Sequence, residues 1–352
     1  MKKKRLFASL SVLMASFCIF GALNIAKAAG GNPVTLSLAH IFPPTHFVNT
    51  SQVSTWIKEI EKATGGSVNF TVFPGGTLLK SAETYDGVVS GTADIAVGVF
   101  AYTRGRFPVM EAFELPGIYF GSCTATSLVA WEGIKRFKPK ELSDTKLMYI
   151  YAVGPGSLYS KKEIKSLADL KGMRIRATGL TAKSIKALGA TPVAMPMPEA
   201  YEALSKGVVE GNIGPPEILK GWKQAEVTKY IVKMPPVYNG IHYCVMNLDK
   251  WNSLPSDVQK AIEKVNEAFI VPAAQIWDSE MKENGIDYGV KEHGMEIGSL
   301  SEEDYAKAMT LMQPLLDDYI ARMAKKGISG KEIVDFVKDR AAWYSKLFPP
   351  AY

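Results

Sequence analysis

The chain has 352 residues, of which 47% are apolar and 22% are charged, and its formal net charge is +6. This composition excludes a disordered chain, a collagen and a disulfide-rich miniprotein, and the length suggests two domains. The positive charge points to an anionic partner such as a nucleic acid or a membrane, but this depends on where the basic residues lie along the chain.

The first 28 residues have the pattern of a secretory signal peptide. Four basic residues at 2–5 precede an apolar stretch from Leu6 to Ile25, and the small-x-small site Ala26-Lys27-Ala28 follows. We therefore expect export and cleavage after Ala28. The alternative is an uncleaved anchor, because the stretch approaches the roughly 20 residues that span a bilayer. Cleavage removes five basic residues and no acidic one, so the mature chain keeps 36 Lys and Arg against 35 Asp and Glu.

Strand and helix patterns alternate along the first part of the mature chain. Alternating apolar residues predict strands, and apolar residues at helical spacing predict helices. Strands are expected at 34–38, 68–73 and 93–99, with helices at 49–63 and 81–90 between them. This order predicts a mainly parallel sheet covered by helices.

A second α/β unit follows without a low-complexity linker, so we predict an α/β protein with two lobes facing a cleft. A long helix is expected at 256–284, interrupted by Pro272, where a kink is typical. The remaining expected strands are at 147–153, 173–177, 191–194, 211–213 and 240–246, and the remaining helical segments are at 166–170, 181–188, 198–206, 302–326 and 330–344.

The chain lacks the common sequence motifs of enzymes. It contains no GxSxG elbow, no HExxH motif and no P-loop. His40 and His46 lie in a predicted loop without a third ligand nearby, so they are either hydrogen-bonded loop histidines or part of a pocket wall. We expect no metal and no cofactor. Basic residues form no run with aromatics, so we expect no nucleic-acid partner.

Two cysteines, Cys123 and Cys244, remain in the mature chain. In an oxidising compartment they can form a disulfide. Both have apolar neighbours, so two buried free thiols are an equal alternative.

Two arginines on one predicted strand are the most informative feature. Arg174 and Arg176 are two residues apart, so both point to one face of the strand at 173–177. A buried arginine needs an anion, and its planar fork matches a carboxylate. The anion is either an internal Asp or Glu or the carboxylate of a ligand, and the strand alone leaves both open.

Five segments in order resemble one family. They are FPGGTLLKSAETYDGVVSGTADIAV, FELPGIYF, SLADLKGMRIRA, LGATPVAMPMPEAYEALSKGVVEGNIGPPE and LPSDVQKAIEKVNEA. The chain is similar over residues 34–345 to the solute-binding proteins of tripartite ATP-independent periplasmic (TRAP) transporters, the DctP family. The resemblance implies a periplasmic protein of the periplasmic-binding-protein type, with no enzymatic activity, that closes on a carboxylate and delivers it to the membrane permease.

The resemblance also implies residue roles and lobe boundaries. The selectivity arginine of the family corresponds to Arg176, which would clamp the ligand carboxylate, with Arg174 in support. The chain would cross between the lobes more than once. Residues 29–153 with 241–279 would form the first lobe and 154–240 with 280–352 the second, and the long helix would brace both.

Departures from the family bear on the ligand. Gly156 and Gly214 stand where sialic-acid-type members carry Arg and Asn, and Ile213-Gly214 replaces the metal ligands of oxo-acid-binding members. We expect both glycines to open volume in the cleft. The candidate neighbours of Arg176 are mainly aromatic or apolar: Phe42, His46, Phe100, Tyr102 and Met197.

These walls favour a monocarboxylate with an apolar body, such as an aromatic acid. A C4-dicarboxylate and a keto or hydroxy acid are the alternative ligands. A different alternative is an exported enzyme that acts on a small carboxylate, with His40 or His46 as general base.

Overall fold

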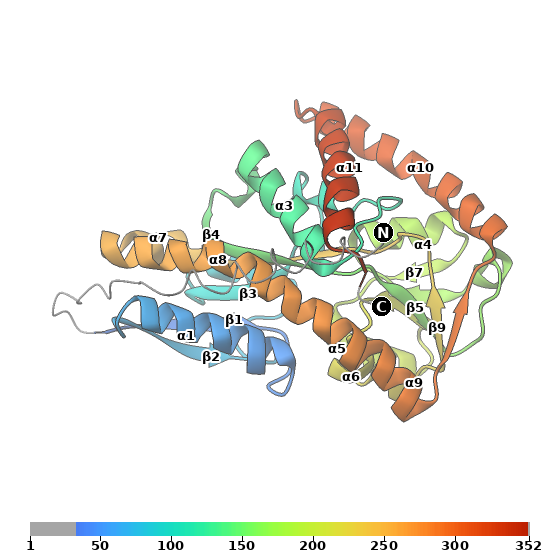
Figure 1. The fold of residues 1–352 in the computed structure, drawn as a ribbon, viewed down its shortest axis with the longest axis horizontal. Coiled ribbons are helices and arrows are strands. Elements are labelled where there is room, and N and C mark those ends of the chain that lie inside the picture. The colour runs from blue at the N-terminus through green and yellow to red at the C-terminus, as the bar shows by residue number, and fades with distance from the viewer. Residues whose placement is uncertain (1–32, 351–352) are drawn as a thin grey trace, which may run out of the picture.

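The computed structural model describes residues 33–350, so the predicted signal peptide and its cleavage site after Ala28 lie outside the described part. Two mixed sheets with helices around each form two lobes side by side (Figure 1). We call the part around the five-stranded sheet the first lobe and the part around the six-stranded sheet the second lobe. Two α/β lobes confirm the predicted fold class.

The first lobe is built on a sheet of order β2-β1-β3-β10-β4. Strand β1 runs parallel to β2 and β3, whereas β10 is antiparallel to both β3 and β4. The three strands from which a mainly parallel sheet was predicted, β1, β2 and β3, do run parallel to one another, whereas β10 enters from the second lobe and runs in the opposite direction. The strands are β1 (Val34–His40), β2 (Val68–Phe73), β3 (Ile95–Val99), β4 (Thr145–Val153) and β10 (Gly240–Asn247).

Helices cover both faces of this sheet. Successive residues of a strand point to opposite faces, so in β4 the side chains of Tyr149 and Tyr151 enter one core and those of Ile150 and Ala152 enter the other. Helices α1 (Ser54–Ala63) and α8 (Ser256–Met281) pack on the tyrosine side. The other side carries α2 (Thr84–Val89) and α3 (Cys123–Phe137), while α7 (Leu248–Asn252) follows β10.

The second lobe is built on a sheet of order β11-β9-β5-β8-β6-β7. Strand β6 is parallel to β7 and β8. A capped turn at Leu167–Leu170, with Ser166 and Asp169 forming a capping box, leads the chain into β6. The strands are β5 (Ser157–Ser160), β6 (Arg174–Arg176), β7 (Thr191–Val193), β8 (Gly211–Gly214), β9 (Tyr230–Lys233) and β11 (Glu296–Ser299). The helices are α4 (Gly179–Ala187), α5 (Met197–Ser205), α6 (Ile218–Gly221) and α9 (Tyr288–His293).

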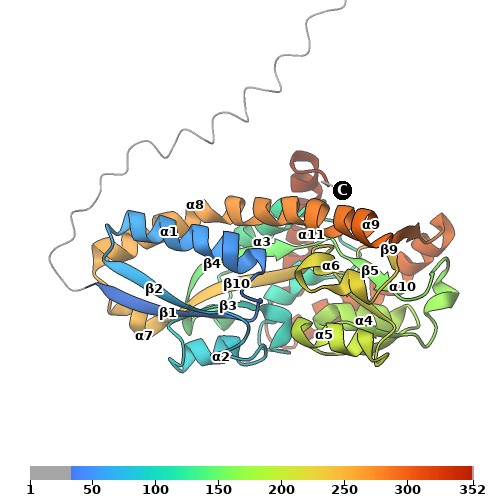
Figure 2. The ribbon, with the colours of Figure 1, turned by 90° about the horizontal axis from the view of Figure 1, so that it is seen from below.

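Helix α8 runs along the molecule from the first lobe toward α9 of the second, beside α1 (Figure 2). It continues past Pro272, and a π-helical segment, Lys282–Asp287, joins it to α9. Within residues 33–350 no helix has the length and apolar character needed to cross a membrane.

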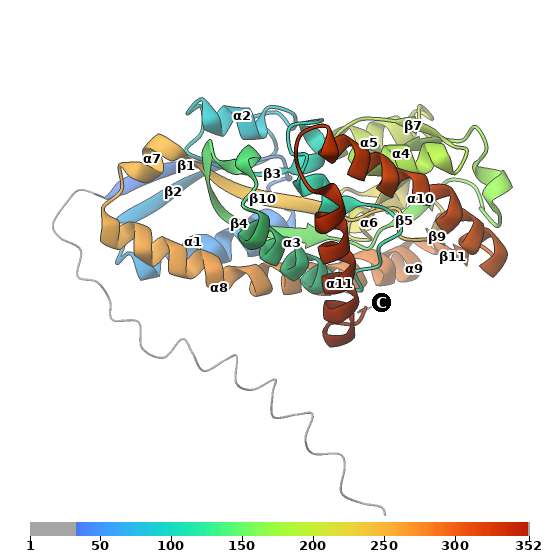
Figure 3. The same ribbon diagram turned by 90° about the horizontal axis from the view of Figure 1, so that it is seen from above.

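Like α8, the C-terminal helices α10 (Glu302–Ala324) and α11 (Gly330–Leu347) contact both lobes: α10 packs against α4 of the second lobe and α11 against α3 of the first. Helix α11 lies against α3 (Figure 3), and its residues Ile333, Val334 and Val337 enter a core of the first lobe. Residues after 280 therefore contact both lobes. The predicted lobe boundaries stay a prediction about which segments move together.

Candidate ligand-binding site

A pocket lined by residues of both lobes lies between them. It is found beside the place where β4 ends at Val153 and β10 begins at Gly240, and these two residues pair in the sheet. The first lobe contributes Ile41, Phe42, Val99, Ala101, Tyr102, Glu114, Val153, Gly240, His242 and Trp277. The second lobe and its connection to β10 contribute Arg176, Thr178, Thr181, Met197, Pro215, Glu217, Trp222, Tyr238 and Asn239.

Arg176 stands at the end of β6 and is 1% exposed. Its Nε donates to the Met195 carbonyl at 2.9 Å. Its Nη1 and Nη2 make long contacts of 3.4 Å to Asn212 Oδ1 and Tyr102 Oη. Within residues 33–350 no carboxylate forms an ion pair with this guanidinium. A buried charge without a counter-ion is costly, so this guanidinium is available to an anion that enters the pocket.

Arg174, at the start of the same strand, has a different environment. Its side chain is 51% exposed and its Nε lies 3.8 Å from Glu210 Oε2. Its Nη2 also donates to the Gly207 carbonyl at 2.9 Å. The internal acid that the sequence left open as a partner for either arginine is therefore found for Arg174.

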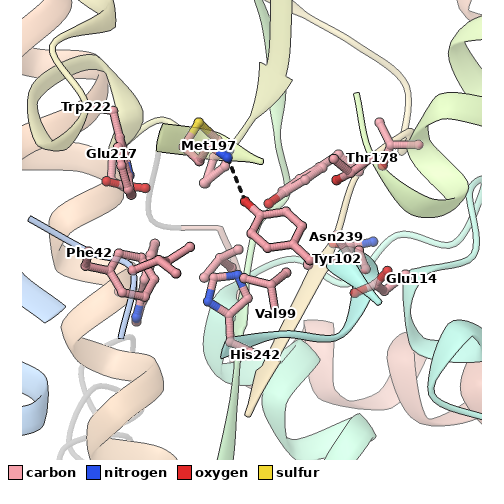
Figure 4. A pocket seen from close by; sticks show the side chains of 18 of the residues that line it. Phe42, Val99, Tyr102, Glu114, Thr178, Met197, Glu217, Trp222, Asn239 and His242 are labelled. Atoms are coloured by element: carbon pink, nitrogen blue, oxygen red, sulfur yellow. Dashed lines mark hydrogen bonds between the residues drawn. The ribbon is translucent and has the colours of Figure 1, made fainter. Parts of the chain in front are cut away.

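Tyr102 joins the two lobes at the pocket. It ends a short 3-10 helix, Phe100–Tyr102, that follows β3. Its hydroxyl oxygen accepts from the Met197 backbone N–H at 3.1 Å, drawn in Figure 4, and from Arg176 at 3.4 Å. Both lone pairs of the oxygen are then used, so its own O–H is left to donate to a ligand.

Burial removes charge from two groups of the first lobe. Glu114 ends the 3-10 helix Met110–Glu114 and accepts a hydrogen bond from Ile241 N–H at 2.8 Å. Burial raises the pKa of Glu114 to about 8. Burial likewise lowers the pKa of His242 to about 3. Near neutral pH the first-lobe wall is therefore largely uncharged.

His46 and Glu217 form a buried pair across the lobes, with Nε2 and Oε2 3.1 Å apart. The backbone N–H of Val48 donates to His46 Nδ1 at 3.2 Å, so Nδ1 provides a lone pair and Nε2 carries the proton donated to Glu217. A Cβ at Gly221 would lie 2.6 Å from Glu217 Oε2 and 2.7 Å from His46 Nε2. Glycine at this position leaves room for the pair.

Four of the eight residues predicted for the site line the pocket together: Phe42, Tyr102, Arg176 and Met197. His46 lies behind Glu217, against the ring of Phe42 at a centroid distance of 4.9 Å. Phe100 packs into the first-lobe core, 4.7 Å from Phe107 and 4.8 Å from Tyr243 between ring centroids. The structure thus places it away from the pocket wall.

The two predicted glycines differ in how much room surrounds them. A Cβ at Gly156 would lie 2.5 Å from Tyr238 Cδ1 and 2.6 Å from the Gly214 carbonyl oxygen. A Cβ at Gly214 would lie 3.3 Å from Ile218 Cδ1 and 3.5 Å from Met197 Cε, close to ordinary van der Waals contact. Tyr238 occupies the space beside Gly156, and neither glycine is among the residues that line the pocket, so the expectation that they open volume for a ligand stays a prediction.

Sequence reasoning missed several pocket residues, among them Glu114, Glu217, Trp222, Tyr238 and His242. Glu114 and Glu217 lie inside the segments that carry the family resemblance, FELPGIYF and GNIGPPE. Their place inside these segments is a sequence signal that could have identified both residues. The neighbouring residues in the sequence, however, do not indicate that either side chain reaches the cleft.

The described residues also bear on cysteine pairing and on metal-ligating side chains. Cys123 and Cys244 are free and buried. Between residues 33 and 350 no cluster of three or more His, Cys, Asp or Glu side chains is arranged to hold a metal ion.

Comparison with known proteins adds relatives that share this architecture. A marine metagenome TRAP solute-binding protein specific for aromatic acid ligands, solved with 3-hydroxybenzoate, is 31% identical and has a TM-score of 0.84, covering 89% of this chain and 99% of that one. A Bordetella bronchiseptica TRAP protein solved with (R)- and (S)-mandelate is 27% identical, with a TM-score of 0.82 and coverages of 88% and 99%.

A curated relative and a family profile cover the same part of the sequence. The C4-dicarboxylate-binding periplasmic protein DctP of Rhodobacter capsulatus is 25% identical over 330 residues, which cover 91% of this chain and 96% of that protein. The profile of the DctP family, bacterial extracellular solute-binding protein family 7, matches residues 25–323. The family consists of solute-binding proteins and not enzymes, which removes the enzyme alternative. The chain therefore belongs to the DctP family of TRAP transporter solute-binding proteins.

Proposed function

We propose that the protein binds an aromatic monocarboxylate in the periplasm, after export and cleavage behind Ala28, and delivers it to a TRAP permease. One observation carries the ligand class. Arg176 is buried at the pocket without an internal carboxylate partner among the described residues. A ligand carboxylate supplies the missing anion through two parallel hydrogen bonds.

Tyr102 adds a second donor to the carboxylate. Its O–H is the one hydrogen-bonding position of the hydroxyl that Arg176 and Met197 leave unused. The carboxylate thus contacts both lobes through Arg176 and Tyr102. Ligand binding then favours the arrangement in which the lobes are close together.

The body of the ligand meets rings and apolar side chains. Phe42 and Trp222 lie with ring centroids 5.9 Å apart and both line the pocket. Val99, Met197 and Trp277 extend this surface. Aromatic rings favour offset and edge contacts with other rings, so a flat aromatic ligand fits these walls better than a short aliphatic chain.

The two solved relatives support the same class, since one is specific for aromatic acids and the other holds mandelate. The Rhodobacter relative keeps a C4-dicarboxylate as the second candidate. Such a ligand needs donors at both ends, and Arg176 is the only Lys or Arg among the described lining residues. The pocket therefore favours a single carboxylate.

Isothermal titration of the mature protein with benzoate, 3-hydroxybenzoate, mandelate and succinate tests the proposal. We expect the aromatic acids to bind and Arg176→Gln to weaken them at least about 100-fold, because charge-assisted hydrogen bonds contribute about 1.5–3 kcal/mol each. Arg174→Gln is the matched control, since that arginine is exposed and pairs with Glu210. Equal affinity of the Arg176 variant and the wild type would contradict the proposal, as would tight binding of succinate alone.

A further inference from the structure

Glu217 presents an unused acceptor to the pocket. The residue is 3% exposed and follows β8 directly after Pro215 and Pro216. Its Oε2 accepts from His46. Within residues 33–350 its Oε1 has no hydrogen-bond partner. Glu217 lines the pocket and its Oε1 is not enclosed by protein, so a ligand in the pocket can supply the donor that this oxygen lacks.

The pair with His46 fixes how this carboxylate stands. His46 is itself held by the Val48 N–H at Nδ1, so its Nε2–H points at Oε2 in one orientation. Trp222 packs against the His46 ring at a centroid distance of 5.6 Å. Glu217 therefore cannot turn its carboxylate freely to satisfy Oε1 elsewhere, and it is pre-organised for a partner in the pocket.

Glu217 also lies apart from the other pocket acid. Figure 4 shows Glu217 with Trp222 and Phe42 on one side of Tyr102, and Glu114 with Asn239 and Thr178 on the other. A ring whose carboxylate is held at Arg176 and Tyr102 therefore has Glu217 at one flank, on the side of the aromatic walls.

We propose that Glu217 is a specificity-determining residue that accepts a hydrogen bond from a donor group on the ligand. The preferred ligand is then an aromatic monocarboxylate with a ring hydroxyl or amino group. A second carboxylate at the same place would face Glu217 charge against charge in a water-poor site. This inference rests on the proposed function and narrows its ligand.

Competition between matched ligands tests it. Benzoate, 3- and 4-hydroxybenzoate, isophthalate and terephthalate differ only in a hydrogen, hydroxyl or carboxylate at the meta or para position. We expect one hydroxybenzoate to bind wild-type protein at least about tenfold more tightly than benzoate, as one satisfied buried hydrogen bond predicts. Both dicarboxylates should bind more weakly than benzoate.

Glu217→Gln supplies the decisive variant. A glutamine can keep the His46 bond through its oxygen and turns an NH₂ donor toward the pocket. In this variant the hydroxybenzoate should bind less than about threefold more tightly than benzoate. The loss of affinity on replacing benzoate by the dicarboxylate substituted at the same ring position should also become smaller. Glu199→Gln is the control, because Glu199 is an exposed glutamate on α5 of the same lobe.

The outcomes separate the two proposals. A wild-type protein that binds benzoate and both hydroxybenzoates equally overturns the role of Glu217, as does a variant that keeps the wild-type ratio. Should Glu217→Gln fail to fold, the wild-type ligand series still decides. Absence of binding by every aromatic acid, or an Arg176→Gln variant that binds them as tightly as the wild type, instead overturns the proposed function itself.

Discussion

The two walls of the pocket differ in how they treat charge. The second lobe contributes Arg176, buried without an ion-pair partner among the described residues, and Glu217 with an open acceptor. The first lobe contributes Glu114 and His242, whose pKa values burial moves to about 8 and about 3. Both are therefore largely neutral near pH 7.

This difference suggests a division of labour. We propose that the second lobe supplies most of the polar contacts to the ligand, with Tyr102 of the first lobe as an added donor. The rest of the first-lobe wall then supplies a neutral, mainly aromatic surface for the body of the ligand. Neutrality of the first wall matters because a negative charge there would oppose the ligand carboxylate that Arg176 attracts. The following predictions test this division, from the largest expected effect to the smallest.

The largest effect concerns the burial of Glu114. Its pKa rises from 4.5 to about 8 on folding, so the folded protein holds a proton that the unfolded chain loses within that window. Stability without ligand should therefore fall as pH rises from 5 to 8. Glu114→Gln, which mimics the neutral acid, should reduce this fall in the free energy of unfolding by roughly 3 kcal/mol.

Urea unfolding at several pH values measures this effect. Glu83→Gln serves as the control, because Glu83 is an exposed glutamate of the first lobe. An unchanged pH slope in Glu114→Gln would show that the first-lobe wall is not kept neutral by burial of this group.

An intermediate effect is expected at Tyr102, where the two walls meet. Tyr102→Phe removes the hydroxyl that contacts Met197 and Arg176 and that we propose donates to the ligand. Benzoate affinity should fall about tenfold, the value of one to two hydrogen bonds in net terms. Titration calorimetry measures it against Tyr119→Phe, a change at a tyrosine that is 48% exposed. Equal affinity of both variants would restrict polar recognition to the second lobe.

The smallest effect is expected at Phe42, which acts through shape alone. Phe42→Leu keeps an apolar side chain but removes the ring that faces Trp222 and His46. The affinity ratio of benzoate to cyclohexanecarboxylate should fall by about three- to tenfold, since aromatic pairs contribute about 0.5–1.5 kcal/mol beyond burial. A ratio equal to that of the wild type would argue against an aromatic first-lobe wall.

Much of the fold follows from patterns that are local in the sequence. The alternation at 34–38 predicts β1, and the helical spacing at 256–284 predicts α8, because one face of each element is buried. The direction of β10 is not local. It depends on the chain returning from the second lobe, and the same alternation suits a parallel or an antiparallel strand.

The site residues likewise differ in whether the nearby sequence could predict them. Arg176 could be identified from its strand and from the family resemblance, whereas its difference from Arg174 depends on Glu210, 36 residues from Arg174 in the chain. The partner of His46 is 171 residues away, so no spacing rule predicts Glu217. Phe100 is an aromatic residue of the kind expected in a pocket wall, but it packs against Phe107 and Tyr243 in the core of the first lobe.

The burial of Cys123 and Cys244 leaves the described part of the chain with an unreactive thiol background, which is convenient for labelling at introduced cysteines. Cys123 and Cys244 are buried, and burial raises the pKa of both thiols, so little reactive thiolate forms at neutral pH. A protein that starts at residue 29 also lacks Cys18. One cysteine introduced on each lobe surface would then carry a fluorophore pair against an unreactive background, and ligand-driven changes in the lobe arrangement could be followed by energy transfer.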